Sequence, residues 1–313
     1  MMPSAAFARR RFPFDAPGYK TRSPAAMRNL TEDNMTDAVI AGIGEATDAR
    51  LKEIMVRLVG HLHDFVREVE LTEEEWLAGI RFLTAVGQKC DDRRQEFILL
   101  SDVLGVSILM DAINNRKPAG ATESSVLGPF YREGAEEMAA GANLSKAQGG
   151  EPCIVSGRVT GPGGTPIAGA LLDVWQTAPN GLYETQDPQQ PDFNLRGKLR
   201  TDTAGRYEFH TVKPVTYPIP DDGPAGRLLG ALGRHSYRPA HIHFIVSAPG
   251  YVPVTTQIFT EGDPYLDSDA VFGVKSRLVA RYVRHETAAD AVERGVTAPF
   301  HTVDYDFELV AEG

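Results

Sequence analysis

The segment at residues 153–177 reads CIVSGRVTGPGGTPIAGALLDVWQT, and its pattern decides the fold class expected for most of the chain. Two short runs rich in β-branched and apolar side chains flank the sequence GPGG at 161–164. Runs of this length, separated by glycine and proline, are typical of a strand, a tight turn and a second strand.

Similar short runs follow along the chain. Residues 197–212, GKLRTDTAGRYEFHTV, predict a hairpin with Ala204 and Gly205 near its turn, and residues 241–250 and 252–260 predict two more strands. Most of the glycines and prolines lie after residue 121. Several short strands with turn signals between them indicate a β-sandwich, which we expect over residues 121–313.

Residues 35–120 carry a helical pattern instead. Apolar side chains recur every three or four positions between Leu51 and Val69, and Thr72 with Glu75 forms a capping box that starts the next helix. A third run at 95–113, QEFILLSDVLGVSILMDAI, is apolar nearly all round, so we expect it to be buried. Helices first and strands later predict an α+β chain with separate helical and β parts.

Composition and charge limit the kinds of function. The chain has 313 residues, 42% hydrophobic and 24% charged, which is ordinary for a globular protein. Its formal net charge of -10 argues against a nucleic-acid-binding protein, which needs a basic face. Cys90 and Cys153 lack the spacing of a metal or redox motif, which favours a reducing, cytoplasmic location. No apolar run approaches the roughly 20 residues that span a membrane.

Residues 1–34 differ from the rest of the chain. They are rich in Arg, Pro and Ala, and they have no apolar core of a secretory signal and no hydrophobic periodicity. We expect a disordered or non-native extension, with Met35 as the true start in the latter case. An organelle transit peptide is the alternative interpretation.

Residues 238–246, RPAHIHFIV, read as a strand that carries two histidines. Side chains two positions apart on a strand point to one face, so His241 and His243 could hold one metal ion. A third histidine, or a carboxylate such as Asp173 or Glu184, would complete a zinc or Fe(II) site. Two histidines with ordinary hydrogen bonds and no metal are the plain alternative.

A set of longer motifs resembles the intradiol ring-cleaving dioxygenases, the catechol 1,2-dioxygenase group. The helical part is similar to this family's N-terminal helical region, and the resemblance covers roughly residues 36–290. The matching segments are SSVLGPFYREGA at 124–135, LLDVWQTAPNGLYETQD at 171–187, NLRGKLRTDTAGRYEFHTV at 194–212, YPIPDDGPAG at 217–226, GRHSYRPAHIHFIVSAPGY at 233–251 and YLDSDAVFGVK at 265–275.

The resemblance implies a non-haem Fe(III) centre, with one iron per subunit and a water or hydroxide on the metal. Its ligands, carried over by motif, are Tyr183, Tyr217, His241 and His243. Without the resemblance, a tyrosine in a loop is more typical of the amphipathic rim of a fold. Fe(III) prefers hard anionic oxygen, and a bound cation can deprotonate a tyrosine, whose ordinary pKa is about 10.

The resemblance also implies roles in the reaction. Tyr217 would leave the metal when a substrate with two adjacent hydroxyls binds, and would help to accept a proton. Arg238 would stabilise negative charge that develops on the ring, with Gln257 as its accompanying polar residue. The ring carbon would attack O2, and hydrolysis of an anhydride would release a dicarboxylic acid.

Within the family, the chain is most similar to members that act on hydroxyquinol (benzene-1,2,4-triol) and insert both atoms of O2 to give 3-hydroxy-cis,cis-muconate (maleylacetate). Catechol and chlorocatechols, which give cis,cis-muconates, are the alternative substrates. The substrate-binding residues carried over by motif are Leu99, Asp102, Val126, Leu127, Gly128, Pro129, Phe130, Ile219, Pro220 and Val271.

Asp102 adds an argument that is independent of the resemblance. It stands in an otherwise apolar run, and a buried carboxyl group is costly unless it has a polar partner. The third hydroxyl of hydroxyquinol would be such a partner, whereas catechol would leave the acid unpaired. An ion pair with Arg93 or Arg94, or an exposed helix edge, is the alternative.

The resemblance implies partners as well. They are a small aromatic diol or triol with O2, a second copy of the chain that binds through the helical region, and in some members a phospholipid at the dimer interface. Two other interpretations of the β part are a transthyretin-like binding sandwich without chemistry, and a cupin-like oxygenase that uses the two histidines and a carboxylate.

Overall fold

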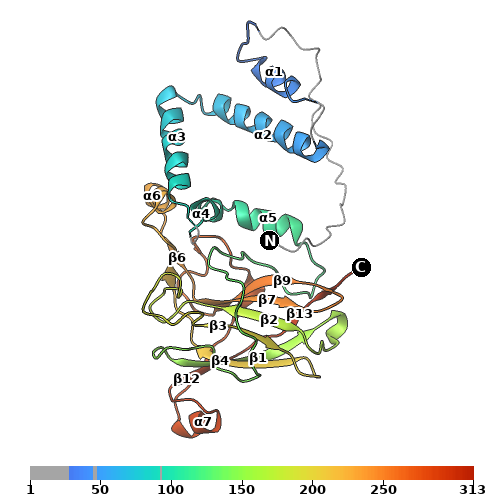
Figure 1. Cartoon of the computed structure of the whole chain (residues 1–313), viewed down its shortest axis with the longest axis vertical. Helices are drawn as coiled ribbons and strands as arrows, with labels where there is room; N and C mark the ends of the chain where they lie inside the picture. The colour runs from blue at the N-terminus through green and yellow to red at the C-terminus, as the bar shows by residue number, and fades with distance from the viewer. Residues whose placement is uncertain (1–27, 45–47, 92–93) are drawn as a thin grey trace. The chain divides into compact units, whose positions relative to one another are not determined.

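The protein is described by a computed structural model that covers residues 28–44, 48–91 and 94–313 (Figure 1). The chain divides into two compact units, Met1–Ile80 and Arg81–Gly313. Most of the extension expected at residues 1–34 lies outside the described residues. The domain boundary expected at residue 120 stays a prediction.

The first unit contains α1 (Met35–Ala41) and α2 (Ala49–Glu68), and α3 (Glu73–Gln88) begins in it. The predicted capping box of α3 is confirmed, because the Glu75 N–H donates to Thr72 Oγ1 and the Thr72 N–H donates to the Glu75 carboxylate. The apolar stripe of α2 is also present. Its side chains are 37–53% exposed, so this face is not buried within the described residues.

The apolar run at 95–113 is not one buried segment, and that expectation is wrong for its second half. It forms α4 (Glu96–Val103) and α5 (Val106–Asn114), which meet at Gly105 in the left-handed conformation, with φ 74°. α4 buries much of its apolar surface because it packs against α6 (Pro224–Ala231). The outer face of α5 has no such cover among the described residues, and the exposed side chains around it are Leu104, Val106, Leu109, Met110 and Ile113.

The β part forms the predicted sandwich of two five-stranded sheets. One sheet has the order β10-β9-β7-β2-β3, made of β10 (Val279–Ala280), β9 (Val254–Thr260), β7 (His241–Ser247), β2 (Leu171–Trp175) and β3 (Arg196–Arg200). The other has the order β11-β12-β1-β13, with β4 also paired to β1; it is made of β11 (Val283–His285), β12 (Phe300–Asp304), β1 (Pro152–Thr160), β13 (Phe307–Glu308) and β4 (Arg206–Val212).

Shorter elements complete the chain. They are β5 (Tyr217–Pro218) paired with β6 (Tyr237–Arg238), β8 (Tyr251–Val252) paired with β14 (Val310–Ala311), α7 (Ala288–Glu293), and the short 3-10 helices Pro162–Gly164 and Ser276–Leu278. No helix among the described residues has both the length and the apolar character that a bilayer crossing requires.

The strands predicted at 153–160 and 197–212 exist, but their partners are not the expected ones. β1 pairs with β4 and β12, whereas β2 pairs with β3 and β7. β3 and β4 therefore lie in different sheets, and the hairpin predicted around Ala204 and Gly205 is wrong. The segment crosses between the layers instead, and the Gly205 carbonyl accepts from the Val159 N–H of β1, so the chain has already reached the second sheet at this residue.

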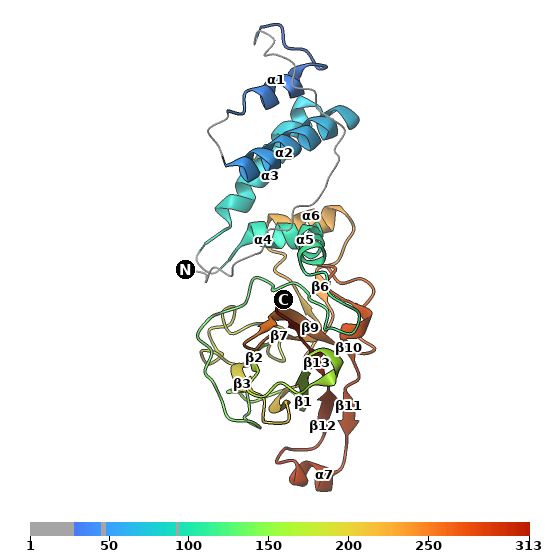
Figure 2. The same cartoon turned by 90° about the vertical axis from the view of Figure 1, so that its right-hand side faces the viewer.

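The hydrophobic core lies between the two sheets. β7 contributes Ile242, Phe244 and Val246 to it, and β1 contributes Val155 and Val159 from the opposite layer. Since side chains alternate along a strand, the intervening residues of β7 project from the other face of its sheet. Figures 1 and 2 both show α4, α5 and α6 on that side, away from β1, so this face is covered as well.

Gly157 tests the packing between strands. It lies on β1 where the pairing changes from β12 to β13, and a Cβ atom built on it would lie 1.9 Å from the Tyr305 carbonyl oxygen. We expect Gly157→Ala to lower the free energy of unfolding by about 1–3 kcal/mol, because the neighbouring backbone must move. The midpoint of urea unfolding measures this change.

Gly230 of α6 provides the matched control, because a Cβ atom there meets nothing within 4 Å. Gly230→Ala should leave stability unchanged or raise it by up to about 1 kcal/mol. An unfolding midpoint of Gly157→Ala equal to that of the wild type would contradict the close approach of the Tyr305 carbonyl to Gly157.

Candidate functional site

The outer face of the β9-β7-β2-β3 sheet carries a row of polar and aromatic side chains. Gln257 lies opposite His243, His243 opposite Trp175, and Trp175 opposite Arg196. Directly opposed residues project to the same side of a sheet, so the four side chains stand side by side. All four are nearly inaccessible to solvent, with exposed fractions of 0–2%.

His241 and His243 both lie on β7 and face each other across 3.0 Å between their Nε2 atoms. His241 Nδ1 lies 2.7 Å from the Pro239 carbonyl oxygen, which can only accept a hydrogen bond. The proton of His241 must therefore be on Nδ1, and its Nε2 carries a lone pair directed into the site. Trp175 stacks on His243 with ring centroids 4.7 Å apart and holds the second imidazole in place.

Tyr183 and Tyr217 arrive from two different segments. Tyr183 follows β2 in a turn where its N–H donates to Gln186 Oε1, and Tyr217 lies on β5 directly opposite Arg238 of β6. Their hydroxyl oxygens are 3.4 Å apart, and both side chains are almost fully buried. The ring centroid of Tyr217 lies 5.4 Å from that of His241, and the centroid of Tyr183 lies 6.5 Å from that of His243. The structure thus brings together the two tyrosines and two histidines that were singled out in the sequence.

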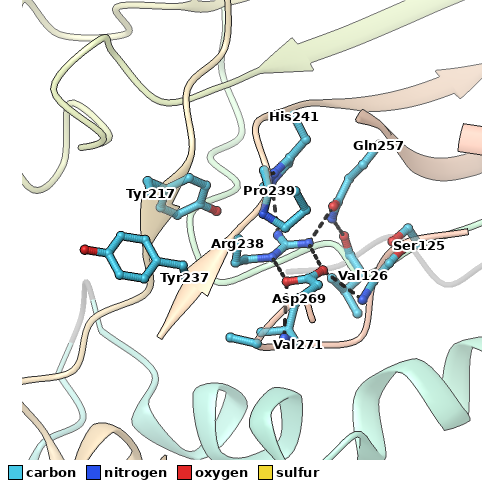
Figure 3. Close-up of polar contacts among 12 residues, drawn as sticks. Ser125, Val126, Tyr217, Tyr237, Arg238, Pro239, His241, Gln257, Asp269 and Val271 are labelled. Carbon is cyan, nitrogen blue, oxygen red and sulfur yellow. Dashed lines mark hydrogen bonds and ion pairs between the residues drawn. The ribbon is translucent and has the colours of Figure 1, made fainter. Parts of the chain in front are cut away.

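Arg238 is the buried cation of this site (Figure 3). Its Nε and Nη2 donate to the two carboxylate oxygens of Asp269 at 3.0 and 3.1 Å, and its Nη1 lies 3.0 Å from Nε2 of His241. Nη2 also donates to Gln257 Oε1 at 2.8 Å, while the Gln257 amide donates to the Val126 carbonyl. Four of the five N–H groups of the guanidinium are thus engaged by neighbours, which hold it in position.

Burial and neighbouring charge set the protonation states. Burial, followed by the charge of Arg238, lowers the pKa of His241 to about 3, and burial together with His241 and Arg238 lowers the pKa of His243 well below its ordinary value. Burial and the neighbouring Tyr217 raise the pKa of Tyr183 well above its ordinary value. Both imidazoles are therefore neutral, so each can offer a nitrogen lone pair to a metal ion. The Tyr183 phenol ionises only if a cation binds beside it.

The donor set fits a hard trivalent metal better than zinc. Two neutral imidazoles and two phenol oxygens converge without a thiol, and the described residues contain no cluster of three His, Cys, Asp or Glu side chains able to hold a metal. The carboxylates considered as ligands are engaged elsewhere. Asp173 accepts from Tyr131 and lies near Lys198, and Glu184 accepts from Arg132 and Arg196.

A small, partly enclosed cavity of about 10 Å³ adjoins these side chains. Its walls include His243, Tyr217 and Arg238, together with eight of the expected substrate-binding residues: Leu99, Asp102, Val126, Gly128, Pro129, Phe130, Ile219 and Val271. Pro220 lines an adjoining outer cavity of about 440 Å³, which shares Leu99, Pro129, Phe130 and Ile219 with the inner one. Leu127 lines neither cavity, and its side chain is 40% exposed.

Asp102 is the one carboxyl group in the wall of the inner cavity, and it is 3% exposed. Burial raises its pKa, and a hydrogen bond with Ser107, followed by the nearby charge of Arg238, offsets part of that effect. Arg94 does not pair with Asp102, because its guanidinium binds Glu96 and Asp222. Arg93, the other expected partner, lies outside the described residues.

Comparison with known proteins identifies the family. Residues 126–313 match the family described as Dioxygenase, and residues 48–122 match the one described as Catechol dioxygenase N terminus. Hydroxyquinol 1,2-dioxygenase of Rhizobium sp. (strain MTP-10005) is 53% identical over 90% of this chain and 96% of its own length. The chain belongs to the intradiol ring-cleavage dioxygenase family.

Two further relatives support this assignment. The 6-chlorohydroxyquinol 1,2-dioxygenase of Cupriavidus pinatubonensis is 50% identical over 90% of this dioxygenase and 99% of its own length. The crystal structure of hydroxyquinol 1,2-dioxygenase from Pseudomonas putida DLL-E4 is 51% identical, with a TM-score of 0.83 over 90% of this chain and 99% of that one. The family is generally Fe(III)-dependent. The transthyretin-like and cupin-like interpretations are therefore wrong.

Three residues of the dioxygenase site were missed in the sequence. Asp269 neutralises Arg238, Trp175 stacks on His243, and Arg196 ends the row on the sheet. Trp175 could have been found in the sequence, because it alternates with the core residues Leu172 and Val174 and therefore projects from the opposite face, with Asp173. Nothing local in the sequence points to Asp269 or Arg196, because each acts on residues far away in the chain.

The pair of Asp269 and Arg238 generates a stability prediction. Burial opposes the charged carboxylate, but the charge and hydrogen bonds of Arg238 prevail and lower the pKa of Asp269. Asp269→Asn leaves a buried guanidinium without its counter-charge, so we expect a loss of about 3–5 kcal/mol in the free energy of unfolding at pH 7. Urea unfolding of both proteins measures the difference.

The same experiment has a defined pH dependence. Because the pKa of Asp269 is lower in the folded state, its contribution is present above the pKa of an unfolded aspartate, about 4, and is lost as pH falls through the folded value. The difference in the free energy of unfolding between the wild type and Asp269→Asn should therefore become smaller at acidic pH. Glu137→Gln is the control, because it breaks only the exposed ion pair with Arg200 and should leave the unfolding midpoint nearly unchanged. Equal destabilisation by both variants would refute the role of Asp269 as the counter-charge of Arg238.

Proposed function

We propose that this dioxygenase cleaves hydroxyquinol (benzene-1,2,4-triol) with O2 between its two adjacent hydroxylated carbons. Both oxygen atoms enter the product, the carbon–carbon bond between these positions breaks, and 3-hydroxy-cis,cis-muconate (maleylacetate) results. The observation that carries the choice of substrate is the buried carboxyl of Asp102 in the wall of the inner cavity. Two relatives named hydroxyquinol 1,2-dioxygenase, which are 53% and 51% identical to this chain, support the same choice.

We propose that Tyr183, Tyr217, His241 and His243 hold one Fe(III) per subunit. Three observations support this proposal: the 3.4 Å between the two phenol oxygens, the 3.0 Å between the two Nε2 atoms, and the ring contacts that join each tyrosine to a histidine. The Pro239 carbonyl also directs the lone pair of His241 Nε2 into the site. When bound, the ferric ion supplies a Lewis acid that holds both deprotonated oxygens of the substrate and withdraws electrons from its ring.

The protein's own residues bind and orient the substrate. Tyr217 lies in the cavity wall beside Arg238, so the phenolate that it would form as a metal ligand would be placed to accept a proton from an arriving hydroxyl. Arg238, held by Asp269 and Gln257, stabilises negative charge on the ring without having to reorganise. Phe130 stacks on Tyr183 at 4.5 Å and separates it from the outer cavity, which limits the access of water.

Asp102 selects the substrate by its hydrogen bond. Ser107 already forms one hydrogen bond with the buried carboxyl. A hydroxyl in the 4-position gives this carboxyl a further partner, whereas catechol offers it none in a wall that is otherwise largely apolar. Catechol and chlorocatechols are therefore the poorer substrates in this proposal. The reverse preference would make the chain a catechol dioxygenase.

The helical part is proposed to form a homodimer interface, with residues 35–120 as the dimerisation domain and 121–313 as the catalytic domain. The exposed apolar face of α2 supports a partner, because such a face is costly in water. A phospholipid bound at this interface and a cytoplasmic location remain predictions from the sequence.

Iron loading tests the metal site. The protein loaded with Fe(III) should be wine-red from tyrosinate-to-iron charge transfer, and removal of iron by a chelator should abolish both the colour and O2 uptake. Tyr183→Phe and Tyr217→Phe should each weaken the visible absorption, since each removes a phenolate donor. Tyr131→Phe is the matched control from the same aromatic cluster, because Tyr131 bonds Asp173 instead. A colourless iron-loaded wild type would disprove the tyrosinate site.

Substrate preference is tested by O2 uptake with hydroxyquinol, catechol and 4-chlorocatechol. Asp102→Ala should lower the hydroxyquinol-to-catechol ratio of kcat/KM by about tenfold or more, because a hydrogen bond to a charged group contributes about 1.5–3 kcal/mol. Leu99→Ala, which alters the same wall without changing its polarity, should affect both substrates alike. Rapid turnover of catechol with none of hydroxyquinol would overturn the proposal.

A further inference from the structure

A second arginine is buried at the opposite side of the site from Arg238. Arg196 stands on β3 at the end of the row that runs through Trp175 and His243 to Gln257, and it is 2% exposed. Trp175 lies between Arg196 and His243 on the sheet. The proposed metal ligands are thus flanked by two buried guanidinium groups, one on each side.

Arg196 is anchored at one atom and free at two. Its Nε donates to Glu184 Oε1 at 2.8 Å, and the same oxygen accepts from Arg132 at 2.7 Å. Arg196 Nη1 and Nη2, although buried, have no hydrogen-bond partner among the described residues. The pair of Arg196 and Glu184 therefore does not reach the full set of hydrogen bonds that usually accompanies a buried ion pair.

The guanidinium of Arg196 also contacts the Tyr183 ring. The central carbon of Arg196 lies over the Tyr183 ring, 5.7 Å from its centroid, which is within the range of a cation–π contact. Glu184, which anchors the arginine, is the residue next to Tyr183 in the chain. One short segment thus carries both the tyrosine and the carboxylate that holds a cation over it.

A structural role alone does not explain this arrangement. Replacing a buried ion pair by apolar side chains of similar volume is often neutral or stabilising, and a pair with unsatisfied N–H groups stabilises a fold even less. A positive charge beside a ring that becomes a phenolate has a direct electrostatic effect, because little water is present to screen it. The geometry is that of a group that acts on Tyr183.

We propose that Arg196, held by Glu184, is a positioning residue for Tyr183 that sets how strongly its phenolate donates electrons to the metal. This inference rests on the proposed function, in which Tyr183 is an iron ligand. The positive charge lowers the energy of the phenolate electrons, and Glu184 limits that effect by partly neutralising the charge. Arg196 thus complements Arg238, which acts on the substrate side of the site.

The tyrosinate-to-iron absorption band of the iron-loaded protein measures this effect separately from activity. Arg196→Met removes the cation, raises the energy of the phenolate electrons and should move the band to longer wavelength. Glu184→Gln leaves the cation without its counter-charge and should move the band to shorter wavelength. Arg196→Lys, which retains the charge, should bring the band back toward its wild-type position.

The opposite signs separate an electrostatic role from a structural one, because loosening the packing around Tyr183 would move both variants in the same direction. Activity should fall by roughly 10–100-fold in Arg196→Met, the range found for residues that orient metal ligands. Arg200→Met is the matched control on the same strand, since Arg200 forms an exposed ion pair with Glu137. It should change neither the band nor the activity.

Bands that stay at the wild-type wavelength, or that move in the same direction in Arg196→Met and Glu184→Gln, overturn the proposal. If Arg196→Met does not fold, Arg196→Gln takes its place, with the same expected shift to longer wavelength. Glu184→Gln does not decide alone, because Glu184 is also the counter-charge of Arg132. A wild type without any tyrosinate band would instead refute the iron site itself, whereas an unshifted band in the variants refutes only the role of Arg196.

Discussion

The alternation of side chains along β7 is the constraint on which the rest of the structure depends. Ile242, Phe244 and Val246 enter the sandwich core, so His241 and His243 must project from the opposite face. A shift of one residue in the pairing register of β7 would exchange the two faces, so the apolar side chains would leave the core and the histidines would leave the site. Since β7 pairs with β2 and β9 on either side, the same ladder that closes the core also sets Trp175 and Gln257 beside His243.

Charge inside this covered face is arranged in pairs. Arg238 has Asp269 as its counter-ion and Arg196 has Glu184, so neither guanidinium is an isolated charge in a medium of low polarity. Their positive potential suits a site that has to accommodate phenolates and a deprotonated substrate. It also keeps the imidazoles neutral, because Arg238 adds to the effect of burial in lowering the pKa of His241 and of His243.

Selectivity and chemistry come from different layers of the fold. The sheet and the β5–β6 ladder provide His243, Tyr217 and Arg238, whereas α4 provides Leu99 and Asp102 to the same cavity. In the proposed function, the reaction depends on the strands, and the choice among aromatic diols and triols depends on the helix that covers them. A change in α4 can alter the substrate without disturbing the donor atoms.

The sequence by itself determined the element types, the α+β order, the capping box at Thr72 and Glu75, and the shared face of His241 and His243. All of these depend on residues a few positions apart, whose spacing is set by helix or strand geometry. Only the tertiary structure decided that β3 and β4 join different sheets, that the outer face of α5 is exposed, and that Asp269 and Arg196 belong to the site. Those features depend on which distant segments pack together, and no local pattern specifies a partner that lies tens of residues away.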